Sequence, residues 1–188
     1  MTETRTGPWT VARLEALPES DWDRFEIVDG ELHLSRVPGD PHQRTTAECI
    51  GELVVWNRQT GLGAVLVAPG ILFSPTNAVQ PDLVWVSHAR LAAIEGDDDH
   101  LHGPPELIVE VLSPGPVNEE RDRATKLQLY SPYGVDEYWI VDPRARIVEV
   151  YRQRDGALQL FATLGDADPL TSPLLPGFAL RVALLFPA

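Results

Sequence analysis

The chain has 188 residues, and 44% of them are hydrophobic, which is enough to bury a core in a single domain over residues 1–188. Its formal net charge of −13 argues against strong nonspecific binding to nucleic acid, because phosphate contacts need clustered Lys and Arg, but it does not exclude a local basic patch. No apolar run approaches the ~20 residues that span a bilayer, and the single cysteine, Cys49, fits a reducing compartment, so we expect a soluble cytoplasmic protein without membrane contacts.

The N-terminal third predicts a lead-in segment, a hairpin and a helix. Residues 1–21 form a short lead-in with apolar positions on one side. Residues 25–35 alternate between apolar and polar side chains around Asp29-Gly30, which is a strong signal for a β-hairpin. Residues 42–60 carry apolar side chains at helical spacing and end before a glycine, so we expect a helix there.

Short strands are expected after this helix. Residues 65–68 and 70–73 are apolar and predict two short strands, and residues 74–77 are rich in turn formers. Residues 80–87 predict a longer strand with a proline near its start, where the missing N–H is tolerated. Residues 88–94 predict a short helix, which a polar loop follows.

The central stretch, residues 105–143, predicts a strand, a helix and a second strand. Residues 107–112 form an apolar run typical of a strand that is buried on both faces. Asn118 is the expected helix N-cap, and apolar positions recur at helical spacing up to Tyr130. Residues 137–141 predict the second buried strand.

The C-terminal part predicts further β-structure. Residues 147–151 predict a hairpin arm, and residues 158–163 predict another strand. Residues 173–186 predict a loop followed by a final apolar strand or helical turn.

Two carboxylates and one ammonium are distinctive in this pattern. Glu110 lies inside an apolar strand, where a carboxylate must be protonated, paired or bound to a cation. Asp82 stands at the head of another apolar strand, and we expect it to be unpaired if it serves a metal site. Lys126 is the only lysine of the chain, and Asp122, Lys126 and Tyr130 share one helix face at four-residue spacing.

Two acids followed by a lysine form a set that metal-assisted phosphodiester hydrolysis requires. Mg²⁺ prefers oxygen ligands, usually one or two carboxylates with water and phosphate oxygens. The cation polarises phosphorus and lowers the pKa of a bound water, and an ammonium can orient that water or neutralise developing charge. By spacing alone, however, Asp82 and Glu110 could equally be capping residues, partners of an arginine or solvated acids.

Other catalytic chemistries have less support in the sequence. A cysteine peptidase would need Cys49 activated by His42 or another histidine, but Cys49 lies among the apolar residues of a predicted helix, where a thiol is usually buried and inert. The sequence contains no glycine-rich phosphate loop, CxxC pair or HExxH motif.

Several segments, taken in order, resemble one known family. They are FEIVDGEL, His42 at the start of a helix, QPDLVWV, PPELIVEVLSP, DRATKLQLY and GVDEYWIVDP. Over about residues 22–186 the chain resembles the bacterial Uma family of endonucleases, within the restriction-endonuclease-like PD-(D/E)xK superfamily. The resemblance implies an α/β fold with a mixed central β-sheet flanked by α-helices and an N-terminal β-hairpin.

The same resemblance implies roles for individual residues. By position, Asp82 and Glu110 match the superfamily's acids and are expected to bind Mg²⁺ or Mn²⁺. The usual lysine would stand two residues after the glutamate, where this chain has Leu112, so Lys126 on the next helix is the expected substitute.

Four further residues are expected at the rim of this site. Glu26 and His42 match positions of the family's N-terminal pattern, and they could assist the metal and contact a phosphate, respectively. Alternatively, Glu26 is an acid at the edge of the hairpin and His42 is a histidine at a helix N-terminus without a role in the site. Asp122 could hold Lys126 through their i, i+4 spacing, and Tyr130 could donate a hydrogen bond to a phosphate or simply pack.

The resemblance thus implies a Mg²⁺-dependent endonuclease that hydrolyses nucleic acid, with DNA as the first choice of substrate. A homodimer is a suitable assembly, because two sites are needed to cut both strands of a duplex. The alternative is a module of the same fold that has lost catalysis and binds nucleic acid or a protein. The acidic net charge and the missing lysine at Leu112 favour this alternative.

Overall fold

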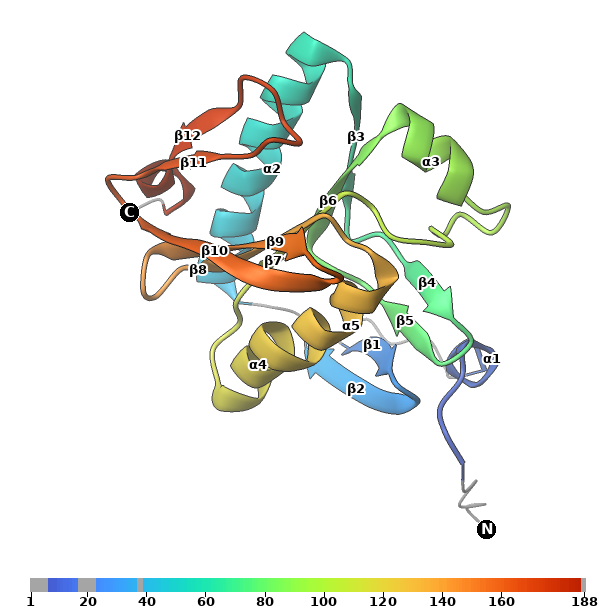
Figure 1. Cartoon of the computed structure of the whole chain (residues 1–188). Coiled ribbons are helices and arrows are strands. Elements are labelled where there is room, and N and C mark those ends of the chain that lie inside the picture. Colours follow the sequence, from blue (N-terminus) through green and yellow to red (C-terminus); the bar gives the residue numbers. More distant parts are fainter. Residues whose placement is uncertain (1–6, 17–22, 37–38, 187–188) are drawn as a thin grey trace.

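A six-stranded mixed β-sheet forms the centre of the computed structural model, which describes residues 7–16, 23–36 and 39–186 (Figure 1). The strand order is β10-β9-β8-β7-β6-β3, in which β7 and β8 are parallel and the other neighbours are antiparallel. The bounds are β3 (Gly63–Val67), β6 (Leu83–Ser87), β7 (Leu107–Val111), β8 (Glu137–Asp142), β9 (Ile147–Arg154) and β10 (Ala157–Gly165). The mixed central sheet that the sequence predicts is confirmed.

Both faces of this sheet are covered, as its uninterrupted apolar strands require. Helix α2 (Asp40–Thr60) and the C-terminal segment pack on one face, and the helical segment after β7 packs on the other (Figure 1). Because side chains alternate along a strand, Val109 and Val111 face the α2 side, and Ile108 faces the opposite side. Glu110 therefore points towards the helical segment that follows its own strand.

A second, four-stranded antiparallel sheet lies beside the first and contains the predicted hairpin. Its order is β2-β1-β5-β4, with β1 (Asp23–Val28), β2 (Glu31–Arg36), β4 (Ile71–Ser74) and β5 (Asn77–Val79). The hairpin turns at Asp29 and Gly30, whose φ angles of 50° and 79° are those that a primed two-residue turn needs. The N-terminal hairpin is confirmed.

The sequence prediction was wrong in two places near this second sheet. A two-residue turn follows β4, and Asn77 already begins strand β5, where the sequence indicated only a turn. The strand expected over residues 80–87 begins at Leu83, because the preceding residues carry the chain from one sheet to the other. Asp82 consequently lies just before β6.

The helical segment after β7 also differs from the prediction. It consists of α4 (Pro116–Glu120), a π-helical turn (Arg121–Thr125) and α5 (Lys126–Tyr133). The N-cap is Gly115 at φ 118°, whereas Asn118 lies inside the helix and its amide donates to the carbonyl of Pro114 at 3.1 Å. A proline at the first helical position suits the φ that a helix start needs, so the helix begins three residues earlier than expected.

The remaining elements agree with the sequence prediction, except for β11, a strand that the sequence did not predict. They are α1 (Val11–Leu14), α3 (His88–Ile94), β11 (Pro169–Thr171), β12 (Ala179–Arg181) and a 3₁₀ turn (Val182–Leu185). The tail thus contains both the strand and the helical turn that the sequence offered as alternatives. Residues 17–21 of the predicted lead-in lie outside the described residues. Within the described part of the chain, no helix has the length and apolar character that crossing a membrane needs.

Two Asp-Gly turns provide a matched test of how the N-terminal hairpin packs. Gly30 and Gly156 both have positive φ, but a Cβ on Gly30 would lie 2.8 Å from Cβ of Pro8, whereas one on Gly156 meets nothing within 4 Å. We expect Gly156→Ala to lower the free energy of unfolding by about 1 kcal/mol, and Gly30→Ala to lower it further. Urea denaturation measures both losses. Equal losses would show that the contact with Pro8 contributes nothing.

Candidate functional site

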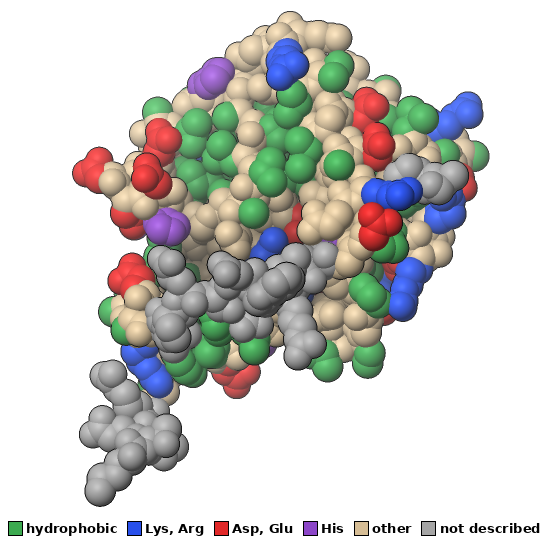
Figure 2. All heavy atoms as spheres, turned by 180° about the vertical axis from the view of Figure 1, so that it is seen from behind, with side chains coloured by type: hydrophobic (Ala, Val, Ile, Leu, Met, Phe, Trp, Pro, Cys, Tyr) green, Lys and Arg blue, Asp and Glu red, His purple; other side chains and the backbone are tan. Residues whose placement is uncertain are grey.

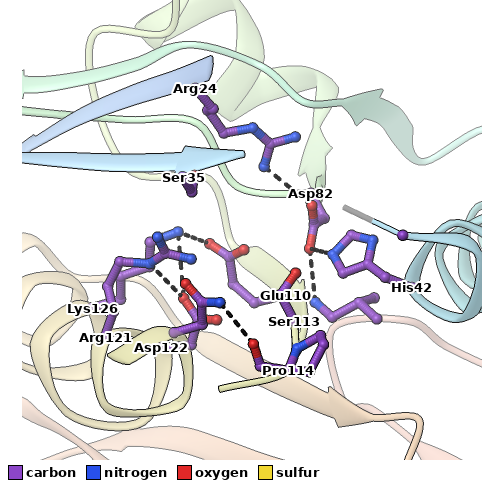
Figure 3. Close-up of a pocket in the computed structure, with 13 residues that line it drawn as sticks. Arg24, Ser35, His42, Asp82, Glu110, Ser113, Pro114, Arg121, Asp122 and Lys126 are labelled. Atoms are coloured by element: carbon purple, nitrogen blue, oxygen red, sulfur yellow. Dashed lines mark hydrogen bonds and ion pairs between the residues drawn. The ribbon is translucent and has the colours of Figure 1, made fainter. Parts of the chain in front are cut away.

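A pocket of about 200 Å³ opens where the end of β7 and the start of β6 meet β1, the beginning of α2 and the helical segment after β7 (Figure 3). Its ionisable lining residues are Arg24, His42, Asp82, Glu110, Arg121, Asp122 and Lys126. The structure therefore brings Asp82, Glu110 and Lys126 together, although they are far apart in the sequence.

The β6–β7 ladder explains why the two acids meet. Leu83 pairs with Val109 in an antiparallel register, and this register brings Asp82 level with Glu110 just beyond the end of the ladder. The N–H of Val111 lies beyond this last pair of the ladder, and it donates to Oδ2 of the Asp82 side chain at 2.8 Å. The carboxylate replaces the next strand residue as the acceptor.

Asp82 is buried and has two more partners. Nε2 of His42 lies 3.1 Å from Oδ2, and Nη1 of Arg24 donates to Oδ1 at 3.2 Å. Burial raises the pKa of Asp82, but the hydrogen bond and charge of His42, the amide of Val111 and the charge of Arg24 outweigh it and lower the pKa to about 2. Because an ionised carboxylate only accepts hydrogen bonds, Nε2 of His42 carries a proton.

The expectation that Asp82 is unpaired was therefore wrong. The head of β6 lies against β1 and α2, and these two elements supply the side chains of Arg24 and His42. Neither contact could be inferred from the residues that precede and follow Asp82. A substitution that removes this carboxylate would leave buried donors without an acceptor, so it would also lower stability.

Glu110 is buried and paired, as the sequence predicts. Its Oε1 accepts hydrogen bonds from Nζ of Lys126 at 2.8 Å and from the hydroxyl of Tyr130 at 3.2 Å. Burial raises the pKa of Glu110 to about 8, and the negative charges of Asp82 and Asp122 add to this rise, although Lys126 opposes it. Within the described residues nothing donates to Oε2, which leaves this oxygen as an open acceptor.

The ammonium of Lys126 contacts three acidic side chains of the site. Its Nζ lies 2.8 Å from Glu110, 3.0 Å from Glu26 and 3.7 Å from Asp122, and the side chain is 1% exposed. Burial lowers the pKa of Lys126, but the three carboxylates more than offset it and raise the pKa above its usual value. The ammonium is therefore charged, and it lies beside Glu110 although Leu112 occupies the superfamily's usual lysine position.

Glu26, which we expected at the rim, lies beneath the pocket instead. It is 1% exposed, and its carboxylate accepts the N–H of Gln80 at 2.9 Å besides contacting Lys126. Burial raises the pKa of Glu26, but the charges of Lys126 and Arg121 and the hydrogen bond from Gln80 lower it overall. The β1–β5 pairing turns this face of the hairpin towards the protein interior.

Tyr130 was also expected at the rim and is fully buried. Its ring packs edge-on against Tyr138, with centroids 5.1 Å apart, while its hydroxyl donates to Glu110. Of the two alternatives for Tyr130, a contact with phosphate or packing, the structure shows packing of the ring. The other two expected rim residues, His42 and Asp122, do line the pocket.

Arg24 is one of the charged pocket residues that the sequence analysis did not find. It lies on β1 two positions before Glu26, so the two side chains point to the same face of the strand. Because the sequence already predicts a hairpin strand here, the two-residue spacing from Glu26 could have identified Arg24 as a residue of the site. Arg121, which the sequence analysis did not name as a site residue, is held by Asp122 at 3.2 Å and Glu26 at 3.9 Å.

The pocket fits a divalent cation through two carboxylates. Among the described residues there is no group of three or more His, Cys, Asp or Glu side chains arranged to hold a metal. Mg²⁺, however, is commonly held by one or two carboxylates while water and substrate phosphate complete its shell. Glu110 offers its open Oε2 to a cation, and Asp82 is ionised, but a cation at Asp82 would have to compete with Arg24, His42 and Val111 for its two oxygens.

A mixed sheet with two acids at the ends of neighbouring strands and a lysine beside them defines a restriction-endonuclease-like protein. Residues 11–183 match the family Uma2, described as "Putative restriction endonuclease", and the chain belongs to this family. It is also similar to a solved protein of Anabaena variabilis, described as "a putative nuclease belonging to DUF820". The TM-score is 0.76 at 17% identity, covering 95% of this chain and 98% of that chain, which shows a shared fold. No curated protein matches the chain. The predicted family and fold class are confirmed.

Replacing the buried ammonium tests how strongly it holds the site together. Lys126→Met leaves Glu26, Glu110 and Asp122 close together without their shared cation, so we expect a loss of about 3–5 kcal/mol in the free energy of unfolding at pH 8. Because Lys126 holds the pKa of Glu110 down, its removal raises that pKa further above the usual 4.5, so the variant loses stability as pH rises above 4.5 and is more stable at pH 5 than at pH 8. Urea denaturation at both pH values measures the difference.

The matched control is Arg44→Met, which breaks the exposed ion pair with Asp40. We expect it to change the free energy of unfolding by less than about 0.5 kcal/mol, with little pH dependence. A loss in Lys126→Met that is as small as the control, or that does not vary with pH, would contradict the role of Lys126 as shared counter-ion.

Cys49 provides a test of the competing cysteine chemistry. Burial raises the pKa of its thiol to about 12, with a further rise from the charge of Asp82. We expect alkylation by iodoacetamide at pH 8 to be at least about 100-fold slower in the folded protein than in urea, because the thiolate is the reactive form. Mass spectrometry of timed samples measures the rates. Fast labelling of the folded protein would reopen a nucleophilic role.

Proposed function

We propose that this protein is a divalent-metal-dependent endonuclease that hydrolyses the phosphodiester bonds of nucleic acid. One observation carries the proposal: Asp82 and Glu110 lie level with each other in one pocket, and the only lysine of the chain places its ammonium 2.8 Å from Glu110. Membership of a family described as restriction endonucleases supports this chemistry.

Asp82 and Glu110 would hold Mg²⁺ or Mn²⁺, which would polarise the phosphorus centre and acidify a bound water. The protein's own groups prepare this site. Val111 and His42 fix the orientation of the Asp82 carboxylate, and Tyr130 fixes that of Glu110. A carboxylate pair held in this way needs little reorganisation when a cation arrives.

Lys126 would neutralise negative charge that develops on the phosphate, or orient the attacking water. Its contacts with Glu26 and Asp122 hold the ammonium in place from the side away from Glu110. Because the helix after β7 supplies this side chain, it can replace the lysine that Leu112 excludes from the strand. A lysine is well suited to this position as a compact point charge.

The substrate that we propose is DNA, bound locally at the pocket. On the face that Figure 2 shows, basic side chains lie scattered among acidic and apolar ones, in keeping with the net charge of −13. Arg24 and Arg121 are the guanidinium groups that line the pocket, and they offer phosphate contacts there. For cleavage of both strands of a duplex, we propose that two copies of the chain act together.

A second candidate is a non-catalytic binding module of the same fold. It is favoured by the internal pairing of the site: both oxygens of Asp82 are already engaged, and Lys126 contacts three carboxylates. A cation would have to compete with these partners. The experiment below separates the two candidates.

Substitution of the acids tests the nuclease proposal. In Mn²⁺ or Mg²⁺, we expect Asp82→Asn and Glu110→Gln to lower cleavage of labelled DNA by about 100-fold or more, because each removes a cation ligand. Duplex DNA, single-stranded DNA and RNA are compared in parallel by gel electrophoresis, and calorimetry measures cation affinity in the same samples.

The matched control is Glu106→Gln. Glu106 is a buried acid just before β7, at the end of the strand opposite the pocket, and it is bonded to Ser87. This variant should cleave as the wild type does. A wild-type protein that binds neither cation and cleaves none of the three substrates would favour the binding module instead.

A further inference from the structure

Arg24 differs from the other partners of Asp82. The amide of Val111 belongs to the backbone of β7, and His42 is 6% exposed with Nδ1 3.3 Å from the hydroxyl of Thr46. Arg24 is 26% exposed and reaches Asp82 from the opposite side to His42 (Figure 3). Of the three donors, only the guanidinium is both at the pocket surface and on a long, rotatable side chain.

The two oxygens of Asp82 are consequently held in different ways. Oδ2 accepts from Val111 and lies against His42, whereas Oδ1 contacts Arg24 at 3.2 Å. A divalent cation at Oδ1 would meet the guanidinium directly, and two like charges on one oxygen repel each other. Movement of the arginine away from Oδ1 would relieve this repulsion when a cation binds there.

In its present position, Arg24 pairs with one acid among the described residues. Within the described residues Asp82 is the one carboxylate in ion-pair distance of Arg24, whose other contact is the carbonyl of Gln80 at 3.2 Å. Arg121, by contrast, keeps Asp122 and Glu26. Once displaced, the guanidinium would lie at the mouth of the pocket, where a substrate phosphate is the natural replacement for a carboxylate.

We propose that Arg24 is an exchangeable counter-ion: it neutralises Asp82 in the free protein and moves to a substrate phosphate when the cation occupies Oδ1. This inference rests on the proposed nuclease function and adds to it a substrate-binding residue and a coupling between the two ligands. Nucleic acid draws Arg24 away from Asp82, so it favours cation binding. By reciprocity, the cation favours nucleic-acid binding.

Arg24→Ala tests the exchange with a readout that does not depend on catalysis. Without nucleic acid, Mn²⁺ should bind this variant about tenfold more tightly than the wild type in calorimetry, because the competing charge is gone. Arg24→Gln keeps a hydrogen-bond donor, removes the charge and should show the same gain. A purely structural arginine would leave cation affinity unchanged or reduce it when replaced.

Binding of nucleic acid should change in the opposite direction. Fluorescence anisotropy of labelled duplex and single-stranded oligonucleotides, with Ca²⁺ replacing Mg²⁺ to prevent cleavage, should show weaker binding in both variants. The slope of log affinity against log salt should fall by about 1, as expected for one lost phosphate contact. Arg90→Ala is the control, because Arg90 also pairs a part-exposed guanidinium with a buried acid, Glu106, at the other end of the sheet.

The outcomes separate the two proposals. Tighter Mn²⁺ binding with weaker oligonucleotide binding in both Arg24 variants, but not in Arg90→Ala, supports the exchange. If the wild type binds Mn²⁺ and the Arg24 variants bind it equally or more weakly, the exchange is overturned while the nuclease proposal stands. If the wild type binds neither Mn²⁺ nor the oligonucleotides, both proposals fall.

Discussion

The buried ammonium of Lys126 is the interaction on which the arrangement of the site depends. It contacts Glu26 on β1, Glu110 on β7 and Asp122 on the π-helical turn, and so connects the hairpin, the central sheet and the helical segment. A buried charge cluster of this kind is a weak source of stability, because desolvation offsets most of the attraction. Lys126 lines the pocket beside Glu110, whereas the hydrophobic core on either face of the sheet supplies the stability.

The place where β6 ends its ladder with β7 decides the geometry of the two acids. Beyond the pair Leu83–Val109 no further strand residue is available on the β6 side, and the carboxylate of Asp82 takes the free amide of Val111. This arises because the chain crosses from the four-stranded to the six-stranded sheet just before Leu83. A change of sheet thus creates a short gap in the backbone hydrogen-bonding pattern, and the site occupies that gap.

The helical segment after β7 brings the ammonium of Lys126 to the pocket. Leu112 packs in the core on the helix side of the sheet, so the strand itself brings no cation to the pocket. The π-helical turn directly precedes Lys126. The backbone N–H of Lys126 donates to the carbonyl of Arg121, which lies five residues earlier in the chain. Insertions of this kind change the phase of a helix and are frequent at functional sites. Here Asp122 and Lys126 both turn inward.

The sequence by itself determined the central strand–helix–strand unit and the N-terminal hairpin. It also determined that Glu110 must be protonated, paired or bound to a cation, and that Lys126 is the only lysine of the chain. These conclusions rest on local periodicity, turn chemistry and the energetic penalty of a buried charge, all of which act within a short stretch of chain. Only the tertiary structure decided that Asp82 is paired and that Glu26 lies beneath the pocket. Arg24, His42 and Gln80, which pair with these acids, are 40 to 58 residues away from them, and which of them meet depends on how strands from two sheets align. No local sequence pattern carries that information, because the ion-pair partners of a charged side chain are the groups that lie near it in space, and these come from distant parts of the chain.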